Sequence, residues 1–552
     1  MAGVTLYGPD NQPLPPSKPS RAAALAGGGR TAYDAAGYSS PHTEGWNPTL
    51  WSPDNERNPF RDIMVARARD LARNDGWASG AVTRILDNAI GASFRPISRP
   101  DHRALAAYSG NAAFDATWAD EYGRAADARH RTWADDYSGK WCDASRQSWM
   151  SLMMGVAFRH LLQENDCCAA LPWRPERVGP GRAHYATCVQ LIDPDRLSNP
   201  GYAFDQRHLR GGIEIDDDQA AVAYNIRKAH PGDWWAGADS VTWERIPRET
   251  SWGRPVFVHY FEPDRANQHR GAGVGIFAPV VERLKMLIGY DVAELEGAII
   301  NAIFAAVAES PFDPELMAEA LGDGDASKIN GYQDARADYH DQRRLMMGRA
   351  KVLQMFPGEK LEIVKSERPN ANFAQFEKAV LRNVAAATGA ATPWITNDWS
   401  DANYSSMRAA LNEAWKTVLR RRKNFGHGFA HPIRAAWLEE CHDLGELPLP
   451  NGAPEFMECR TAYARAIWAG PGRGSVDPVA EAKAAVLRMD AGLSTLETEA
   501  MEYGGDFYED ILDQRAAEIA GYKKRGMAPP TWSGMNPMGE PASRTITDPE
   551  PA

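Results

Sequence analysis

The chain has 552 residues and a formal net charge of −12 at neutral pH, from 61 Lys and Arg against 73 Asp and Glu. Hydrophobic residues make up 43% of the sequence and charged residues 24%, which is ordinary globular usage and excludes a wholly disordered or fibrous protein. The acidic balance excludes a protein that wraps nucleic acid by neutralising its phosphates, because such binding needs a cationic surface.

The N-terminal part of the chain changes from an irregular arm to helices. Residues 1–57 are rich in Pro and Gly, so we expect a flexible arm. Helices are expected over residues 62–74 and 77–90, where apolar residues recur at helical spacing and an Asp-Gly pair separates the two segments. A further helix is expected over residues 148–163.

A β-rich region follows between residues 189 and 260, with short apolar runs broken by Pro, Gly and Asp. Cys167 and Cys168 lie beside apolar residues, which favours burial over reactivity. Six cysteines in so long a chain do not indicate a disulfide framework and fit synthesis in a reducing cytosol. The acidic residues between 214 and 218 could bind a divalent cation, but they lack the spacing of a calcium loop, so a solvated hairpin turn is favoured.

Residues 276–308 form the most periodic segment of the sequence. Apolar residues recur there at three-and-four spacing: Val280, Leu284, Leu287, Ile288, Val292, Leu295, Ile299, Ile303 and Val307. A helix of this length is roughly 50 Å long and needs a partner along it, either within the chain or from another copy. We expect Ile299 and Ile303 to be buried, so that a charge there would be costly. No apolar run reaches the ~20 residues that span a membrane.

Three glycines, Gly271, Gly273 and Gly275, precede this helix. Glycines before a helix can bring its N-terminus close to a pyrophosphate, which raises the alternative of a nucleotide-binding turn. The repeat is GxGxG rather than GxGxxG, and a polar stretch separates it from the strand before it. A hinge that starts the long helix is therefore favoured.

The C-terminal half contains two basic features. A polar stretch, residues 311–350, holds basic side chains that could meet a phosphate backbone: Lys328, Arg336, Arg343 and Arg344. Residues 420–423, Arg-Arg-Arg-Lys, close an expected helix and could equally meet phosphates or form a solvated face. The other expected elements are a strand pair (352–356 and 361–364), helices over 372–387 and 405–423, and a helical unit over 477–524.

Motifs for catalysis are absent from the sequence. There is no GxxxxGK[ST] string, which excludes a P-loop ATPase, and no Ser/His/Asp arrangement or GxSxG elbow. His427 and His431 stand at helical zinc-ligand spacing, but neighbouring glycines and a proline interrupt such a helix, so packing histidines are favoured. We expect no catalytic residue, no cofactor and no metal.

Particular strings carry a resemblance to a known family. They are Arg67-Ala-Arg69-Asp-Leu71-Ala-Arg73-Asn74, Gln190-Leu-Ile-Asp-Pro-Asp-Arg196, His259-Tyr-Phe-Glu-Pro-Asp-Arg265 with Arg270-Gly271, and Asp401-Ala-Asn403-Tyr-Ser-Ser406-Met-Arg408. With them the sequence resembles the lambda-type family of tailed-phage portal proteins over roughly residues 30–525. It departs from the family at residues 392–397, which replace a longer aliphatic segment.

The resemblance implies a mostly helical α+β subunit with a wing, stem helices, a β-containing clip and a helical crown. Its implied parts are a flexible N-terminal arm (1–57), the wing (58–165 and 351–445), the clip (166–265), the stem helix (266–310), a channel-facing loop (311–350), the crown (446–526) and a disordered tail (527–552). In the stem, the packing residues would be Leu284, Leu287, Ile288, Leu295, Ile299 and Ile303.

The implied function is a homo-oligomeric ring, commonly of twelve subunits, at one vertex of a capsid. Double-stranded DNA would enter through its channel during packaging and leave through it at ejection, passing Lys328, Arg336, Arg343 and Arg344. The implied partners are the major capsid protein, the terminase large subunit and a head-completion or neck protein, with no membrane involved. The ring would assemble in the host cytoplasm and reside in the virion. The alternatives are another virion ring, such as a head–tail connector, and a DNA-packaging enzyme, against which the missing P-loop argues.

Overall fold

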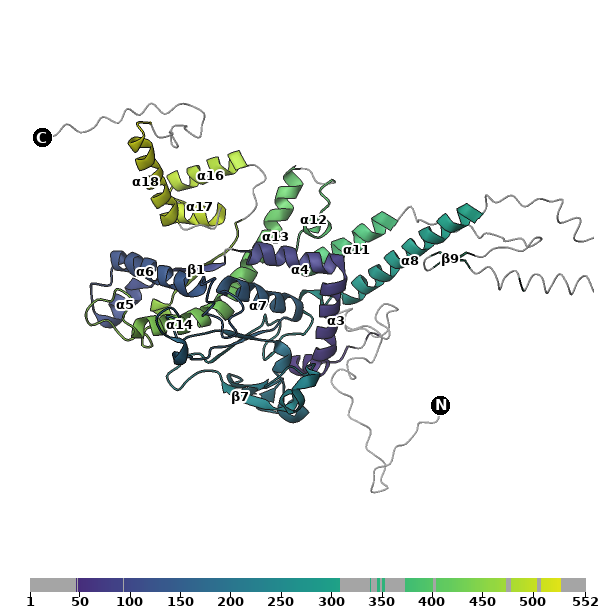
Figure 1. The fold of residues 1–552 in the computed structure, drawn as a ribbon, viewed down its shortest axis with the longest axis horizontal. Helices are drawn as coiled ribbons and strands as arrows, with labels where there is room; N and C mark the ends of the chain where they lie inside the picture. Colours follow the sequence, from purple (N-terminus) through teal and green to yellow (C-terminus); the bar gives the residue numbers. More distant parts are fainter. Residues whose placement is uncertain are drawn as a thin grey trace, which may run out of the picture. The chain divides into compact units, whose positions relative to one another are not determined.

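The computed structural model of the chain describes residues 46, 48–92, 94–307, 338, 345–347, 350–352, 373–400, 404–472, 478–503 and 508–527. The chain divides into two units, Met1–Glu56 and Arg57–Ala552. In the first unit, the described residues include most of a short helix, α2 (Pro53–Arg57). Everything below concerns the second unit (Figure 1).

Helices dominate the described residues, so the expected α+β, mostly helical class is confirmed. Before the β-rich region they are α3 (Arg61–Asn74), α4 (Gly76–Ala89), α5 (His102–Ser109), α6 (Ala116–Ala134) and α7 (Met150–Glu164). Asp75 separates α3 from α4, and its carboxylate accepts the Ala78 backbone N–H at 2.6 Å. The Asp-Gly pair noted in the sequence is therefore the N-cap of α4 as well as the end of α3.

The later helices are α11 (Phe373–Thr388), α12 (Thr392–Thr396), α13 (Tyr404–Phe425), α14 (His431–Asp443), α15 (Arg460–Tyr463), α16 (Pro478–Asp490), α17 (Leu496–Tyr503) and α18 (Tyr508–Lys524). A turn of π-helix (Gly426–Ala430) joins α13 to α14. At this turn Gly428 lies so close to the Tyr260 ring that a Cβ atom would stand 2.3 Å from it. A glycine is required there because no side chain would fit.

The β-rich region contains two antiparallel sheets. The first has the order β3-β2-β8 and the second β4-β5-β6-β7. Their strands are β2 (Cys167–Ala170), β3 (Gln190–Ile192), β4 (Leu209–Arg210), β5 (Ile213–Ile215), β6 (Ala221–Arg227), β7 (Trp243–Pro247) and β8 (Phe257–Tyr260). The two sheets share a small core that includes Ile192, Ile213 and Phe257.

The main core lies among the helices. It joins α3, α4, α6 and α7 to α13 and α14, and Trp437 of α14 stacks on Trp133 of α6 with ring centroids 5.6 Å apart. A two-stranded sheet, β1 (Arg95–Ser98) with β11 (Ala466–Ala469), ties two distant parts of the chain together beside this core. None of the helices within the described ranges has the length and apolarity needed to cross a bilayer.

The long helix is α8 (Val281–Val307), with a 3₁₀ turn (Gly275–Phe277) ahead of it. The expected start at residue 276 is therefore five residues too early, because buried Phe277 keeps the apolar spacing although it lies outside the helix. A hairpin, β9 (Leu345–Met347) with β10 (Ala350–Val352), lies at the end of the stretch expected to be a loop. Most of the strand pair expected over 352–364 lies outside the described residues, as do the arm up to residue 45 and the tail from residue 528.

Candidate functional site

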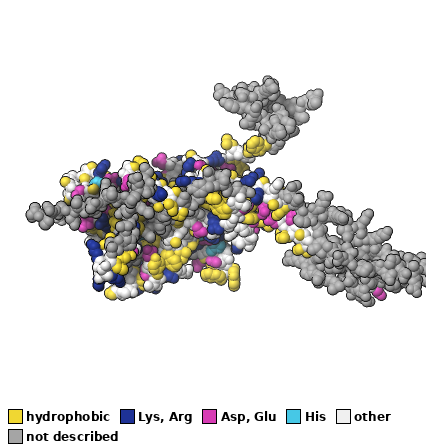
Figure 2. Space-filling model, turned by 90° about the horizontal axis from the view of Figure 1, so that it is seen from above, with side chains coloured by type: hydrophobic (Ala, Val, Ile, Leu, Met, Phe, Trp, Pro, Cys, Tyr) yellow, Lys and Arg dark blue, Asp and Glu magenta, His cyan; other side chains and the backbone are white. Residues whose placement is uncertain are grey.

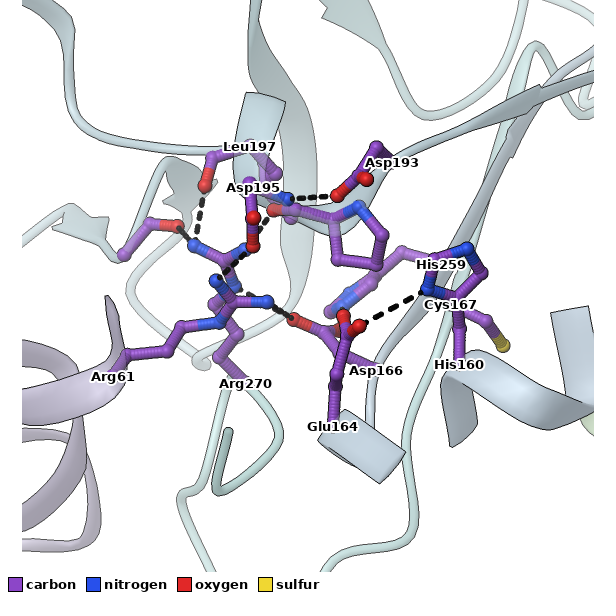
Figure 3. Close-up of polar contacts among 12 residues, drawn as sticks. Arg61, His160, Glu164, Asp166, Cys167, Asp193, Asp195, Leu197, His259 and Arg270 are labelled. Atoms are coloured by element: carbon purple, nitrogen blue, oxygen red, sulfur yellow. Dashed lines mark hydrogen bonds and ion pairs between the residues drawn. The ribbon is translucent and has the colours of Figure 1, made fainter. Parts of the chain in front are cut away.

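A cluster of buried charges joins helices α3 and α7 to the β-rich region (Figure 3). We call it the charged junction, and its members are Arg61, Arg69, Arg270, Glu164, Asp166, Asp193 and Asp195. Arg69 of α3 contacts three carboxylates, donating to Glu164 at 2.6 Å, to Asp193 at 3.0 Å and to Asp195 at 2.8 Å. The side chains of Glu164 and Asp166 are fully buried, so their ion pairs are shielded from solvent and removing a partner is costly. The pair of Arg69 with Asp193 is partly exposed.

Arg270 occupies the centre of this arrangement. Its Nε donates to the Asp166 carboxylate at 2.8 Å, and its other nitrogens donate to backbone carbonyls of Pro194, Leu197 and Gly211. The guanidinium thereby holds the residue before strand β2 and the loops after β3 and β4 at one point. Because Arg270 precedes α8 by only a short segment, this contact also fixes where α8 begins relative to the β-rich region.

Asp166 is the carboxylate on which the junction depends most. Burial by itself would raise the pKa of Asp166, but Arg270, His259 and Arg61 outweigh that effect and hold the pKa well below its usual range. His259 contacts Asp166 at 2.5 Å and Arg61 donates to it at 3.4 Å. The carboxylate therefore stays charged at all ordinary pH values.

Aspartates of the junction form two groups with neighbouring residues whose donor atoms are close enough to share a metal ion. They are Asp166, Cys168 and His259, and Asp193, Asp195 and His230. Arginines already donate to the aspartates of both groups, and burial raises the pKa of the Cys168 thiol well above its usual value. These donor sets fit ion pairs rather than a metal, because a cation would have to displace guanidinium groups.

The three glycines before α8 pack against the end of α7. A Cβ atom on Gly271 would stand 1.7 Å from the Asn165 carbonyl oxygen, and one on Gly275 would stand 2.0 Å from the Leu162 carbonyl oxygen. The Gly273 N–H donates to the Glu164 carbonyl at 2.9 Å. The glycines permit this close backbone packing, and the expected hinge stays a prediction.

In the part of α8 whose side chains the structure describes, residues 281–299, the subunit buries apolar side chains near the start of the helix and leaves later ones exposed. Leu284 and Leu287 are buried and Ile288 is partly buried, whereas Leu295 is 64% exposed and Ile299 54% exposed. The expectation that Ile299 is buried is therefore wrong for a single subunit, and the side chain of Ile303 lies outside the described residues. Leu295 and Ile299 are therefore the described part of the stripe that still needs a partner.

The other candidate residues have varied positions. Lys328, Arg336, Arg343 and Arg344 lie outside the described residues.

The six cysteines, all of them described, are unpaired, and Cys167 and Cys168 are buried as expected. In the acidic hairpin turn, Asp216 accepts the backbone N–H groups of Asp218 and Ala220. Burial lowers the pKa of His431 to about 4, which fits a neutral packing histidine.

In the basic run at the end of α13, Arg420 and Lys423 are exposed, whereas Arg422 is buried and has a structural role that the sequence did not indicate. Arg422 donates to the backbone carbonyls of Asn88 and Ala89 at the end of α4, and to Pro471. A cation at a helix C-terminus satisfies unpaired carbonyls and complements the helix dipole. Arg422 is thus neither a phosphate ligand nor part of a solvated face.

Sequence reasoning missed the charged junction, although a signal was present. Arg69, Asp193, Asp195, His259 and Arg270 all belong to the strings that carry the family resemblance. Three of the four strings, although far apart along the chain, meet in space at the junction; Figure 3 labels Asp193, His259 and Arg270 among them. Their shared position explains why those residue types occur together in one chain.

Comparison with known proteins agrees with the resemblance. Residues 39–422 match the family described as phage portal protein, lambda family. The chain is 32% identical over 501 residues to the portal protein of Escherichia phage N15, covering 89% of this chain and 90% of the relative. It is 31% identical over 497 residues to portal protein B of Escherichia phage lambda, covering 88% and 89%. The chain belongs to the lambda family of phage portal proteins.

Solved structures give a weaker likeness. A chain from the neck of an empty gene transfer agent particle matches with a TM-score of 0.33 and 12% identity, over 76% of this chain and 98% of that chain. A chain from the neck of the native particle, computed with C12 symmetry, matches with a TM-score of 0.30 and 14% identity, over 77% and 99%.

Proposed function

We propose that copies of this chain assemble into a closed ring of twelve at one capsid vertex, with double-stranded DNA passing through its centre during packaging and ejection. Membership of the portal family supports the ring and its place in the virion. The observation that carries the proposal is the exposure of Leu295 and Ile299 of α8, which a single subunit leaves uncovered. A neighbouring copy related by rotation would cover it, and repetition of such a head-to-tail contact closes a ring.

The sides of α8 are suited to different neighbours. Tyr290 packs against Phe373 and Phe376 of α11, with ring centroids 5.4 and 5.3 Å apart, so this side belongs to the subunit itself (Figure 1). Leu295 and Ile299 lie on a second side, displaced round the helix by more than a quarter turn at 100° per residue. This second side is the one that we assign to the next copy.

A conduit for DNA should not bind DNA tightly. On the face shown in Figure 2, basic side chains are interspersed with acidic ones rather than gathered in a single patch, and the whole chain is acidic. Cationic walls would hold phosphates in a strongly salt-dependent way. We infer that the few channel contacts come from Lys328, Arg336, Arg343 and Arg344, in a loop that faces the channel.

The remaining assignments rest on the family. The proposed partners are the major capsid protein, the terminase large subunit and a head-completion protein, with the β-rich region as the clip that meets the last two. The wing, crown and stem keep the boundaries given above. We propose no enzymatic activity, because the energy for packaging would come from the terminase, and we place assembly in the host cytoplasm.

Electron microscopy of the purified full-length protein tests the ring. We expect closed rings with a central hole wide enough for a duplex, and no hydrolysis of nucleoside triphosphate. Protein that stays monomeric at every concentration would contradict the ring, and unaided ATP hydrolysis would favour the packaging enzyme.

A second experiment tests the channel assignment. Reversing the charges of Lys328, Arg336, Arg343 and Arg344 together should reduce DNA packaging while leaving ring formation intact. Equal loss of both, or no effect on either, would remove these residues from the channel.

A further inference from the structure

Two arginines from different loops lie beside one tryptophan ring, away from the charged junction. The guanidinium carbon of Arg146, in the loop between α6 and α7, is 3.7 Å from the centre of the Trp141 ring. That of Arg182, in the loop between β2 and β3, is 5.9 Å from the same centre. The negative face of an aromatic ring attracts a guanidinium group. The ring thus brings two like charges close together on residues that are both exposed.

The backbone around the ring has a conformation that side chains seldom adopt. Lys140 and Arg146 have φ +51° and +58°, in the left-handed region that favours glycine. The carboxylate of Asp143 supports this conformation by accepting three backbone N–H groups between residues 145 and 148. Backbone hydrogen bonds to Val189 join the same loop to the β-rich region. The fold therefore fixes the backbone from which Arg146 reaches the ring.

Neither arginine at the ring is neutralised within the subunit. Among the residues that the structure describes, Arg146 and Arg182 make no ion pair. The Nε of Arg146 donates to the Gly139 carbonyl at 3.1 Å, which leaves the edge formed by its two Nη groups without an acceptor. A planar fork of charged N–H donors matches the oxygens of an anion such as phosphate.

Acidic side chains in the two loops make other contacts. Asp136 and Asp143 accept backbone N–H groups of their own loop, and Glu176 faces Arg174 at 3.9 Å. Arg177 brings a third guanidinium group to the cluster, where it donates to a backbone carbonyl of the loop at 2.9 Å. The cluster therefore stays positive in a chain whose net charge is −12.

We propose that Arg146 and Arg182, oriented by Trp141, form a surface site for a phosphate group. A phosphate offers more oxygen acceptors than a carboxylate and can accept from both guanidinium groups at once. The ring holds these side chains in place before binding, so less side-chain freedom is lost when the anion arrives. The same chemistry occurs in inorganic phosphates and in the backbone of DNA. The site belongs to one subunit and does not require a ring.

Calorimetric titration of the full-length protein tests the site, with inorganic pyrophosphate as the probe and malonate as its carboxylate counterpart. We expect saturable binding of one pyrophosphate per subunit and weaker binding of malonate. Arg146→Gln and Arg182→Gln should each weaken pyrophosphate binding about tenfold, because each removes charge-assisted hydrogen bonds. Trp141→Leu keeps every charge but no longer orients the guanidinium groups, so it should also weaken binding. Circular dichroism checks that each variant is folded.

The matched control is Lys523→Gln combined with Lys524→Gln. Both lysines are exposed in the last turn of α18, and their loss changes the net charge as much as the loss of both arginines does. This control should leave pyrophosphate binding unchanged. A diffuse effect of charge would instead weaken binding equally in the lysine and arginine double variants and leave Trp141→Leu unaffected, which would overturn the proposal.

Fluorescence anisotropy of a short labelled DNA duplex separates the two sources of phosphate. DNA binding that pyrophosphate competes away, and that the arginine double variant weakens more than the lysine control does, indicates the DNA backbone. Pyrophosphate binding with no such effect on DNA indicates a free phosphate. Absence of saturable binding by both probes, or binding of malonate as tight as that of pyrophosphate, would overturn the assignment of a phosphate site.

Discussion

At the scale of single residues, Asp166 is a buried carboxylate whose charge stabilises several neighbouring side chains. It neutralises Arg270 and contacts Arg61 and His259. Asp166→Asn would leave two buried guanidinium groups without this charge, so we expect the subunit to lose about 3–5 kcal/mol of unfolding free energy. Urea unfolding of the unassembled subunit measures this.

A matched exposed pair provides the control for that measurement. Arg207 and Asp217 meet at 3.0 Å, but both side chains are about four-fifths exposed. Asp217→Asn should therefore cost less than about 1 kcal/mol. Similar losses for the two variants would show that the junction is no more than a surface network.

Buried neutral histidines predict how stability depends on pH. Burial lowers the pKa of His442 to about 4, whereas an unfolded histidine titrates near 6.5. The unfolded chain therefore binds the extra proton first as pH falls. This stabilisation is complete above about pH 6.5 and is lost towards pH 4, by roughly 1.4 kcal/mol per pH unit.

His442→Gln should make that slope shallower. The Tyr122 hydroxyl contacts the His442 Nε2 at 2.6 Å, and Gln keeps a polar partner there without titrating. Urea unfolding of the subunit at pH values between 4 and 8 gives the two slopes, with pH 8 as the reference at which both chains are neutral at this position. Identical slopes would show that His442 is not the titrating group. Burial would lower the pKa of His160, but Glu164 outweighs burial and raises it. The effect of His160 on the pH dependence of stability therefore has the opposite sign.

At the scale of elements, sequence patterns predicted the positions of helices, which depend on residues close together in the chain. The segments that became α3, α4 and α8 were predicted within a few residues, because apolar spacing and an Asp-Gly break are properties of neighbouring residues. The charged junction could not be predicted in this way. Its hydrogen bonds join residues as far as 134 positions apart, and a single sequence does not show which arginine meets which carboxylate. The same holds for Arg422, whose partners belong to α4.

The glycine segment before α8 gives a prediction at the same scale. Gly275 has φ +51°, and an added Cβ would lie 2.0 Å from the Leu162 carbonyl oxygen. Gly275→Ala should destabilise the subunit by at least about 2 kcal/mol, from overpacking together with backbone strain. Gly80→Ala is the control, since nothing lies within 4 Å of its Cβ position in α4. It should stabilise the subunit by up to about 1 kcal/mol. Thermal melting compares the two, and equal effects would contradict the close packing.

At the scale of the whole molecule, the subunit buries the apolar side chains of its main core but leaves several apolar side chains of α8 exposed. The main core covers Leu284 and Leu287 of α8, while apolar side chains beyond them stay exposed. Apolar surface on a long helix is unfavourable while water contacts it in a lone subunit. Covering that surface with another copy is favourable. Folding and assembly should therefore respond to different residues of one helix.

Leu295→Asp separates these two processes. Leu295 is exposed in the single subunit, so the substitution should change the unfolding free energy by no more than about 0.5 kcal/mol. In a ring it would place an unpaired charge against the next copy, and rings should be lost. Met286→Asp is the matched control, because Met286 is 73% exposed but lies about 180° round the helix from Leu295, and its rings should persist. Light scattering with electron microscopy measures assembly, and circular dichroism measures stability. A Leu295→Asp chain that unfolds, or that assembles as well as Met286→Asp, would place the subunit contact on another side of α8.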